Sequence, residues 1–505
     1  MTFGVTGRNV VANLFGSAWT ALMSVVFVPV YLRFLGPEAF GLVGVLAALQ
    51  AVFGVLDFGL GATFNREMAR LSARGSDGTQ ERELLRTLEA VYWSIAAIVG
   101  IAIGLLAATI SHRWVHAQHL APSAITRSIV LMGAIVACQF PFALYQAGLL
   151  GRQRQVLLNV VAISFTTLRT LGAVLLISYV APSIELFFAW QASLMLVQVV
   201  VTAVLLGRDL PRAPRKARIR LPLIRGLWRF SAAIGGNAIL GVVLSQTDKI
   251  LLSGMLPLSH FGYYTLAGSV AAVLWYVINP ITTAFYPHFT HALHAGNEEY
   301  AVDTYHRACQ LMALLLLPIS ATVAAFMYPL IFIWTGNAGL AQATAVTAAL
   351  LICGTTLNGL ATLPILLGTA AGFPGVIFLT NLIALGVIEP AIFFATRRFG
   401  VVGAASVWVI LNSFYVVIAV PLVHRRVLQH ETWRWYANDF AKPLIVAAAL
   451  GSIARLVMPG NLTTAGTIAY VAVSGLVIAI ATAMVLPHVV ALGKNLIRGT
   501  LEVRV

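Results

Sequence analysis

Charged residues are scarce in this sequence. Only 10% of the 505 residues are Asp, Glu, Lys or Arg, whereas a soluble globular domain carries roughly 25%. Too few charges remain to cover a surface that faces water, and this excludes an ordinary soluble protein. Hydrophobic residues make up 59% of the chain and give it a mean hydropathy of +0.89.

Cysteine is nearly absent as well. Cys138, Cys309 and Cys353 all fall in apolar runs, so we expect neither a disulfide framework nor a cysteine-based metal site. Histidines gather in 112–119 and 288–294, but no acidic or cysteine ligand accompanies them, and we predict no metal. Walker, zincin and glycine-rich phosphate-binding motifs are missing too, which excludes direct use of ATP.

The apolar residues form runs of about 20, each long enough to cross roughly 30 Å of hydrocarbon as a helix. The short alternating strands of a membrane β-barrel are not seen. We therefore predict an all-α polytopic membrane protein with about fourteen membrane helices. The expected spans are 10–32, 40–62, 90–110, 128–150, 157–180, 184–206, 229–254, 262–287, 307–334, 343–368, 374–396, 401–423, 441–459 and 464–487.

Acidic residues number only 17 against 32 basic ones, a net charge of +15. Such a charge could suggest nucleic acid, but the positions of the basic residues argue against it. Most of them fall in one alternating set of loops, chiefly 63–89 and 207–229. Because membrane proteins concentrate Lys and Arg in cytoplasmic loops, this predicts that both termini are cytoplasmic and that nucleic acid is not a partner.

The sequence also contains an internal duplication. Leu35–Leu42 aligns with Leu256–Tyr263 at an offset of 221, which pairs spans one to six with spans seven to twelve. An even number of spans gives both halves the same orientation, as in transporters built from parallel repeats around a substrate path. Gly41 and Gly262 occupy matching positions, and we attribute these glycines to close helix packing.

The duplication predicts four segments. They are an N-terminal lobe over 1–206, a basic cytoplasmic linker over 207–228, a C-terminal lobe over 229–424, and two further helices with a cytoplasmic tail over 425–505. The linker mixes basic with apolar side chains like an interfacial helix. We expect it to bind anionic membrane lipids.

Several short motifs resemble one known family. They are Leu35–Gly41, Leu56–Gly61, Asn65-Arg66-Glu67, Asp248-Lys249 and Phe399–Ala405. With them the sequence resembles the polysaccharide transporter family, the Wzx-type flippases of lipid-linked oligosaccharides. The resemblance implies the MOP-superfamily, MATE-like fold, with two pseudo-symmetric six-helix lobes around a central cavity and two C-terminal helices.

The resemblance also implies a function. A flippase of this kind moves polyprenyl-pyrophosphate-linked oligosaccharide from the cytoplasmic to the outer leaflet of the bacterial inner membrane, by alternating access. Its product feeds surface polysaccharide synthesis such as that of O-antigen, so polymerase and chain-length proteins are expected partners. No cofactor is expected, and a proton or sodium gradient would supply any energy.

Ionisable groups within the spans are the candidate site residues, because each costs roughly 3 kcal/mol to place there. Arg169 lies near the middle of its span, and a guanidinium fork suits a pyrophosphate. With Arg66 and Lys249 it forms the predicted substrate site. A structural ion pair is the equal alternative for Arg169, and Glu389 is its expected partner.

Carboxylates in the spans are candidates for ion coupling, since burial raises the pKa of a carboxyl group. Asp57, Asp248 and Glu389 are the three candidates, although local pairing is favoured for Asp57 and Asp248. Uncharged polar residues could line a path for sugar hydroxyls or form interhelical hydrogen bonds. They are Gln50, Gln139, Gln146, Asn237, Asn381 and Asn412.

Two other functions compete with the flippase. A MATE-like multidrug or cation antiporter would share the fold, but the mid-span Arg169 argues against a cavity for cations. A membrane-embedded polyprenyl-linked glycosyltransferase or polymerase would need catalytic groups on a sizeable outer loop. The predicted outer loops are short and poor in acidic residues, so we predict a transporter without catalytic residues rather than an enzyme.

Overall fold

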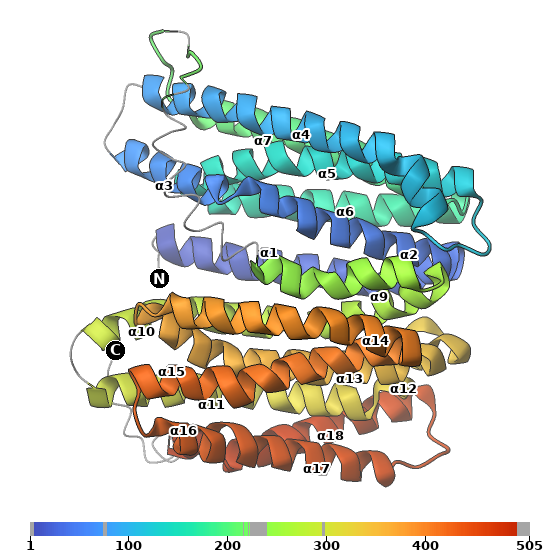
Figure 1. The fold of residues 1–505 in the computed structure, drawn as a ribbon, viewed down its shortest axis with the longest axis vertical. Helices are drawn as coiled ribbons and strands as arrows, with labels where there is room; N and C mark the ends of the chain where they lie inside the picture. Colours follow the sequence, from blue (N-terminus) through green and yellow to red (C-terminus); the bar gives the residue numbers. More distant parts are fainter. Residues whose placement is uncertain are drawn as a thin grey trace. The chain divides into compact units, whose positions relative to one another are not determined.

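The computed structural model describes residues 5–73, 78–215, 217–220, 222, 240–294 and 298–491, and within them it contains helices but no strand. The all-α prediction is confirmed (Figure 1). The chain divides into two compact units, Met1–Thr265 and Leu266–Val505. The predicted division into two lobes, linker and tail stays a prediction.

The first unit holds seven labelled helices, a helix over 240–255 and the first part of α9. Their bounds are α1 Val5–Val26, α2 Val28–Gly54, the 3-10 turn η1 Val55–Asp57, α3 Leu60–Ala73, α4 Thr79–Arg113, α5 Pro122–Gly151, α6 Gln155–Tyr179, α7 Ile184–Asp209 and α9 Leu258–Ala272. Within this unit α5 packs against both α4 and α7, and α1 packs against α6.

The second unit holds the rest of α9 and the later helices. Their bounds are α10 Trp275–His294, α11 Glu298–Ala325, α12 Met327–Thr335, α13 Ala338–Ala370, α14 Pro374–Phe414, the π-helix η2 Tyr415–Ala419, α15 Val420–Val427, α16 Glu431–Arg434, the π-helix η3 Trp435–Ala441, α17 Lys442–Leu456 and α18 Thr464–Met484. Within this unit α13 packs against α11 and α14, and α18 packs against α11 and α17.

Nine helices among the described residues are long and apolar enough to cross a membrane, or ten if the bent pair α9–α10 is one span. One of them covers two expected spans, because Ile377–Val427 is continuous except for a kink at Gly400. A similar kink at Gly36, where φ is 78°, separates the first two expected spans within α2. Part of the expected span 229–254 lies outside the described residues.

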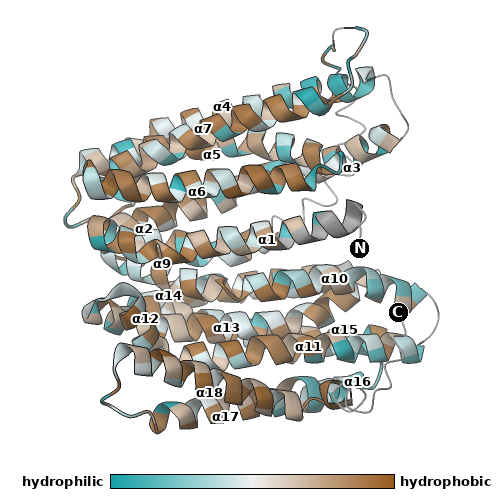
Figure 2. Ribbon diagram, turned by 180° about the vertical axis from the view of Figure 1, so that it is seen from behind, coloured by the Kyte–Doolittle hydropathy of each residue, from teal (hydrophilic) through white to brown (hydrophobic). Residues whose placement is uncertain are grey.

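Large apolar side chains cover the outside of the helices. On α4, Ile98, Ile101 and Leu105 are 68%, 62% and 79% exposed, while Tyr92 and Val99 on its other face are buried. Figure 2 shows hydrophobic residues along the middle of the helices and hydrophilic ones gathered at helix ends. A soluble protein does not expose such continuous apolar faces, so they face lipid and the chain is a membrane protein.

The matching glycines of the duplication meet in the first unit, at the crossing of α2 and α9. A Cβ on Gly41 would lie 2.6 Å from the carbonyl oxygen of Leu258, and one on Gly262 would overlap the carbonyl oxygen of Pro37. Backbones at such short range leave no room for a side chain. The geometry agrees with the packing explanation for both glycines.

The chain breaks at two places, at the end of the span Val28–Asp57 and between α9 and α10. After α2 the chain passes through η1 and through Phe58 and Gly59, both with positive φ, before α3 begins. The chain also breaks between α9 and α10, which are bent by 41°. Broken membrane helices leave backbone groups unpaired, and transporters use such sites to bind substrates and ions.

Candidate transport site

Arg169 lies on α6 and turns toward α7. Its guanidinium donates to Oε1 of Gln198 and contacts the sulfur of Met195 at 2.9 Å, while its buried Nε has no partner. No carboxylate of the described residues in the first unit forms an ion pair with it. The side chain is therefore held by neutral groups, and its positive charge stays uncompensated within this unit.

Asp57 sits at the break between α2 and α3. Its carboxylate accepts a short hydrogen bond from the Tyr92 hydroxyl on α4 and two weak ones from the Gly61 N–H, at 3.2 and 3.3 Å. The break determines where the Asp57 side chain lies, because Asp57 is the last residue of η1 and the following residue, Phe58, adopts a left-handed conformation. The unwound backbone thus brings a carboxylate and a phenol together within a span.

Asp248 and Lys249 are neighbours in the helix over 240–255 and point to different partners. The Asp248 carboxylate accepts a 2.6 Å hydrogen bond from Tyr264 of α9, and its second oxygen is buried without a partner. Lys249 donates to Gln246 Oε1 at 2.9 Å. Adjacent residues diverge by about 100° on a helix, so these two cannot pair ideally.

Glu389 lies half-buried on α14 and has no hydrogen bond or ion pair with the described residues of the second unit. Its expected pairing with Arg169 joins residues of different units and stays a prediction. In the second unit, Asn381 accepts a 2.8 Å hydrogen bond from Tyr415, and buried Asn412 accepts one of 2.7 Å from Asn358.

The remaining candidates lie in the first unit. Gln139 donates from Nε2 to the Gln50 carbonyl at 3.3 Å, so the structure brings these two predicted cavity residues into contact. Gln146 is exposed on α5, and Arg66 is exposed on α3. Asn237 lies outside the described residues.

Sequence reasoning missed an acidic residue that organises one end of the first unit. Glu38 is only 6% exposed and accepts hydrogen bonds from the backbone N–H groups of Gln118, His119 and Leu120. These donors are 80 or more residues away in the sequence. The only available signal was the position of Glu38 directly after the kink-forming Gly36-Pro37.

A second missed cluster lies in the second unit. His306 contacts Asp439 through Nδ1 and Glu431 through Nε2, the latter at 2.8 Å, and Gln310 donates to Asp439 at 2.8 Å. His306 and Asp439 each stand just before an expected span, which placed them at helix ends without showing that they meet. Among the described residues no three His, Cys, Asp or Glu side chains form a group that could hold a metal ion.

A comparison with protein families decides the assignment of the chain. Residues 6–293 match the model of the family described as "Polysaccharide biosynthesis protein". The chain belongs to this polysaccharide biosynthesis protein family. A search of the curated proteins returns no match to the sequence.

Solved structures show the same fold as this polysaccharide biosynthesis protein. A lipid II flippase MurJ in an inward closed conformation aligns with a TM-score of 0.70 at 12% identity, covering 94% of this chain and 98% of that one. An inward-facing MATE-family multidrug resistance transporter of the MOP superfamily aligns with a TM-score of 0.64 at 13% identity, covering 81% and 94%.

A third similar structure is the MATE multidrug transporter DinF-BH, with a TM-score of 0.62 at 16% identity, covering 84% of this chain and 95% of that one. At these identities the likeness concerns the fold. The polysaccharide biosynthesis protein therefore has the fold of MOP-superfamily transporters, and the predicted fold class is confirmed.

Proposed function

We propose that the protein is a flippase that moves polyprenyl-pyrophosphate-linked oligosaccharide from the cytoplasmic to the outer leaflet of the bacterial inner membrane. It works by alternating access and supplies surface polysaccharide synthesis such as that of O-antigen. Its termini are cytoplasmic, its product passes to polymerase and chain-length proteins, and no catalytic residue takes part. The family to which the chain belongs and the fold that it shares with a lipid II flippase support the proposal.

The observation that carries the proposal is the uncompensated guanidinium of Arg169 in the middle of α6. A pyrophosphate in a membrane needs fixed positive charge, and a guanidinium presents a fork that matches phosphate oxygens. Gln198 and Met195 hold Arg169 with neutral atoms. In the described part of the first unit no carboxylate pairs with Arg169. A phosphate therefore has to replace only these neutral contacts.

The two helix breaks, after η1 and between α9 and α10, supply the second support. A break between two helices lets them tilt separately, and alternating access can use such a motion. Asp57 with Tyr92, and Asp248 with Tyr264, place a carboxylate beside a phenol in or beside these helices. In the proposal, these carboxylates and Glu389 are the groups through which a proton or sodium gradient drives the exchange.

Transport by the purified full-length protein in liposomes tests the proposal. The probe is a polyprenyl-diphosphate-linked oligosaccharide with a fluorophore on its sugar, and a membrane-impermeant quencher reports its appearance in the opposite leaflet. We expect wild-type protein to expose the probe and Arg169→Ala to slow this at least about tenfold, since a charge-assisted phosphate contact is worth about 1.5–3 kcal/mol. Arg113→Ala, at the exposed end of α4, is the matched control and should not change the rate.

The same vesicles distinguish the alternatives. Flipping that proceeds equally well with Arg169→Ala contradicts the role of that residue. Uptake of a lipophilic cation without movement of the glycolipid contradicts the flippase and favours the MATE-like antiporter, for which the similar MATE structures and the carboxylate of Asp57 within a span are the supporting observations. A lengthened glycan on the recovered probe would instead indicate the glycosyltransferase or polymerase.

A further inference from the structure

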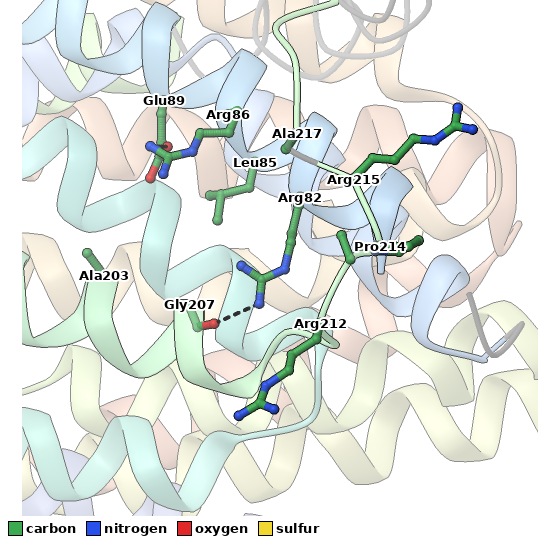
Figure 3. A pocket seen from close by; sticks show the side chains of 11 residues that line it. Arg82, Leu85, Arg86, Glu89, Ala203, Gly207, Arg212, Pro214, Arg215 and Ala217 are labelled. Carbon is green, nitrogen blue, oxygen red and sulfur yellow. Dashed lines mark hydrogen bonds and ion pairs between the residues drawn. The ribbon is translucent and has the colours of Figure 1, made fainter. Parts of the chain in front are cut away.

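A groove of about 900 Å³ opens at the end of the first unit where α4 begins and α7 ends, next to a short segment of which the structure describes residues 211–215 and 217. Figure 3 shows its lining, which combines the first turns of α4, the last turns of α7 and this segment. Arg82 and Arg86 come from α4, and Arg212 and Arg215 from the segment. None of these residues takes part in the proposed transport site.

The charge of the groove is positive after the ion pairs of its lining residues are counted. Arg86 pairs with Glu89 at 3.1 Å, so these two cancel. Arg82 donates only to backbone carbonyls, to that of Pro211 at 2.7 Å and to those of Leu210 and Gly207. Arg212 and Arg215 are exposed and form no hydrogen bond or ion pair with the described residues of this unit. Three guanidinium groups thus lack a carboxylate from the described part of the unit.

The geometry separates the roles of these arginines. Figure 3 shows Arg82 reaching toward the Gly207 carbonyl, with Arg212 on the same side of the groove, whereas the Arg215 side chain points away. Carbonyl contacts hold Arg82 in place but do not neutralise its charge. Because Nε and Nη2 of Arg82 donate to these carbonyls, its Nη1 is left to contact a phosphate, and the free guanidinium of Arg212 can contact the same group from another side.

The surroundings of the groove indicate that this phosphate belongs to a lipid. Buried Leu85 and the small Ala203 are among its lining residues, and nearby on α7 the apolar side chains of Val200 and Val204 are 54% and 45% exposed. On α4, Trp93 is 42% exposed, and tryptophan is enriched at the level of the membrane interface. A ligand in the groove therefore has apolar surface within reach of its tail.

We infer that the groove binds an anionic phospholipid of the adjoining leaflet, with its phosphate between Arg82 and Arg212 and its acyl chains along α4 and α7. Arg215 adds to the positive field at the rim. The basic loops predict that this end is cytoplasmic, where the negative surface potential of the leaflet favours basic segments. The inference rests on the membrane location of the chain and not on the proposed substrate.

Lipid binding to the purified full-length protein in detergent tests the inference. Phosphatidylglycerol and phosphatidylcholine are titrated separately, and bound lipid is counted by native mass spectrometry. We expect the dissociation constant for phosphatidylglycerol to be at least tenfold lower, because only its headgroup keeps a net negative charge. Equal binding of the two lipids overturns the inference.

Variants locate the site on this groove. Arg212→Gln should weaken the binding of phosphatidylglycerol at least about tenfold, the loss of one charge-assisted hydrogen bond. Arg218→Gln is the matched control, because Arg218 is exposed on the same stretch of chain but does not line the groove. It should change binding less than threefold. Equal effects of the two variants would indicate that lipid is attracted by the general positive charge of this region. That result would overturn the assignment of the binding site to the groove.

Competition distinguishes a lipid from a free phosphate. Inorganic phosphate at 10 mM and constant ionic strength should not displace phosphatidylglycerol, since it lacks the acyl chains. Displacement of phosphatidylglycerol by inorganic phosphate would contradict the inference that the ligand is a lipid. A photoactivatable phosphatidylglycerol should label peptides from 82–89 and 203–217 in the wild-type protein, and labelling confined to other peptides would contradict the site without any substitution.

Discussion

Replacement of Glu38 by glutamine should release the loop that follows α4. The Glu38 carboxylate accepts N–H groups from three successive residues, at 2.6 Å from Gln118, 3.0 Å from His119 and 3.1 Å from Leu120. Because Glu38 is 6% exposed, water does not easily replace it. Glutamine keeps the size of the side chain but loses the charge and turns one of its two acceptors into a donor.

The magnitude follows from the contacts that glutamine cannot make. Its amide nitrogen would face one or two of the backbone N–H groups and leave them unsatisfied, and each buried unsatisfied group costs about 1–3 kcal/mol. We expect the free energy of local opening of 118–120 to fall by about 2–3 kcal/mol. Since 1.4 kcal/mol is a factor of ten, the exchange of these amide hydrogens should become about 30–150 times faster.

Hydrogen–deuterium exchange of the purified protein, read from peptides that cover 114–121, measures this change. Glu185→Gln is the matched control, because Glu185 pairs with Arg127 in an exposed position, where an ion pair contributes less than about 1 kcal/mol. Exchange of 118–120 that stays within threefold of wild type would refute the reasoning, since it would mean that the carboxylate does not hold the loop.

Two further substitutions test packing and charge within the first unit. Asp209→Asn should lower the stability by about 2–4 kcal/mol, because Asp209 binds the largely buried Arg152 and also Arg154. The measurement is the midpoint of thermal unfolding in detergent, which should fall. The control Asp303→Asn loosens only the exposed pair with Arg307 and should cost less than about 1 kcal/mol. Gly262→Ala should destabilise the protein by about 1–3 kcal/mol in the same assay, because its Cβ would overlap the Pro37 carbonyl, while Gly268→Ala on the same helix meets open space and should be neutral or stabilising. Equal shifts for Asp209→Asn and Asp303→Asn, or for the two glycine variants, would contradict these explanations.

The sequence alone determined the class of the protein and much of its segmentation. A membrane helix is a local feature, since one apolar run contains everything that makes it span the bilayer. The kink at Gly36 follows from the same local chemistry, because a glycine before a proline accepts a backbone conformation that ends a helix. The duplication also placed Gly41 and Gly262 at matching positions, which the structure brings to one crossing.

Which side chains meet depends on the three-dimensional packing of the helices. Sequence reasoning sought a carboxylate partner for Arg169 because opposite charges attract, yet in its own unit the guanidinium is held by Gln198 and Met195. Glu38 binds amides 80 or more residues away, and His306 meets Asp439 across 133 residues. Such pairs depend on how helices pack and on how each is rotated about its axis. The hydropathy pattern of the sequence contains no information about either.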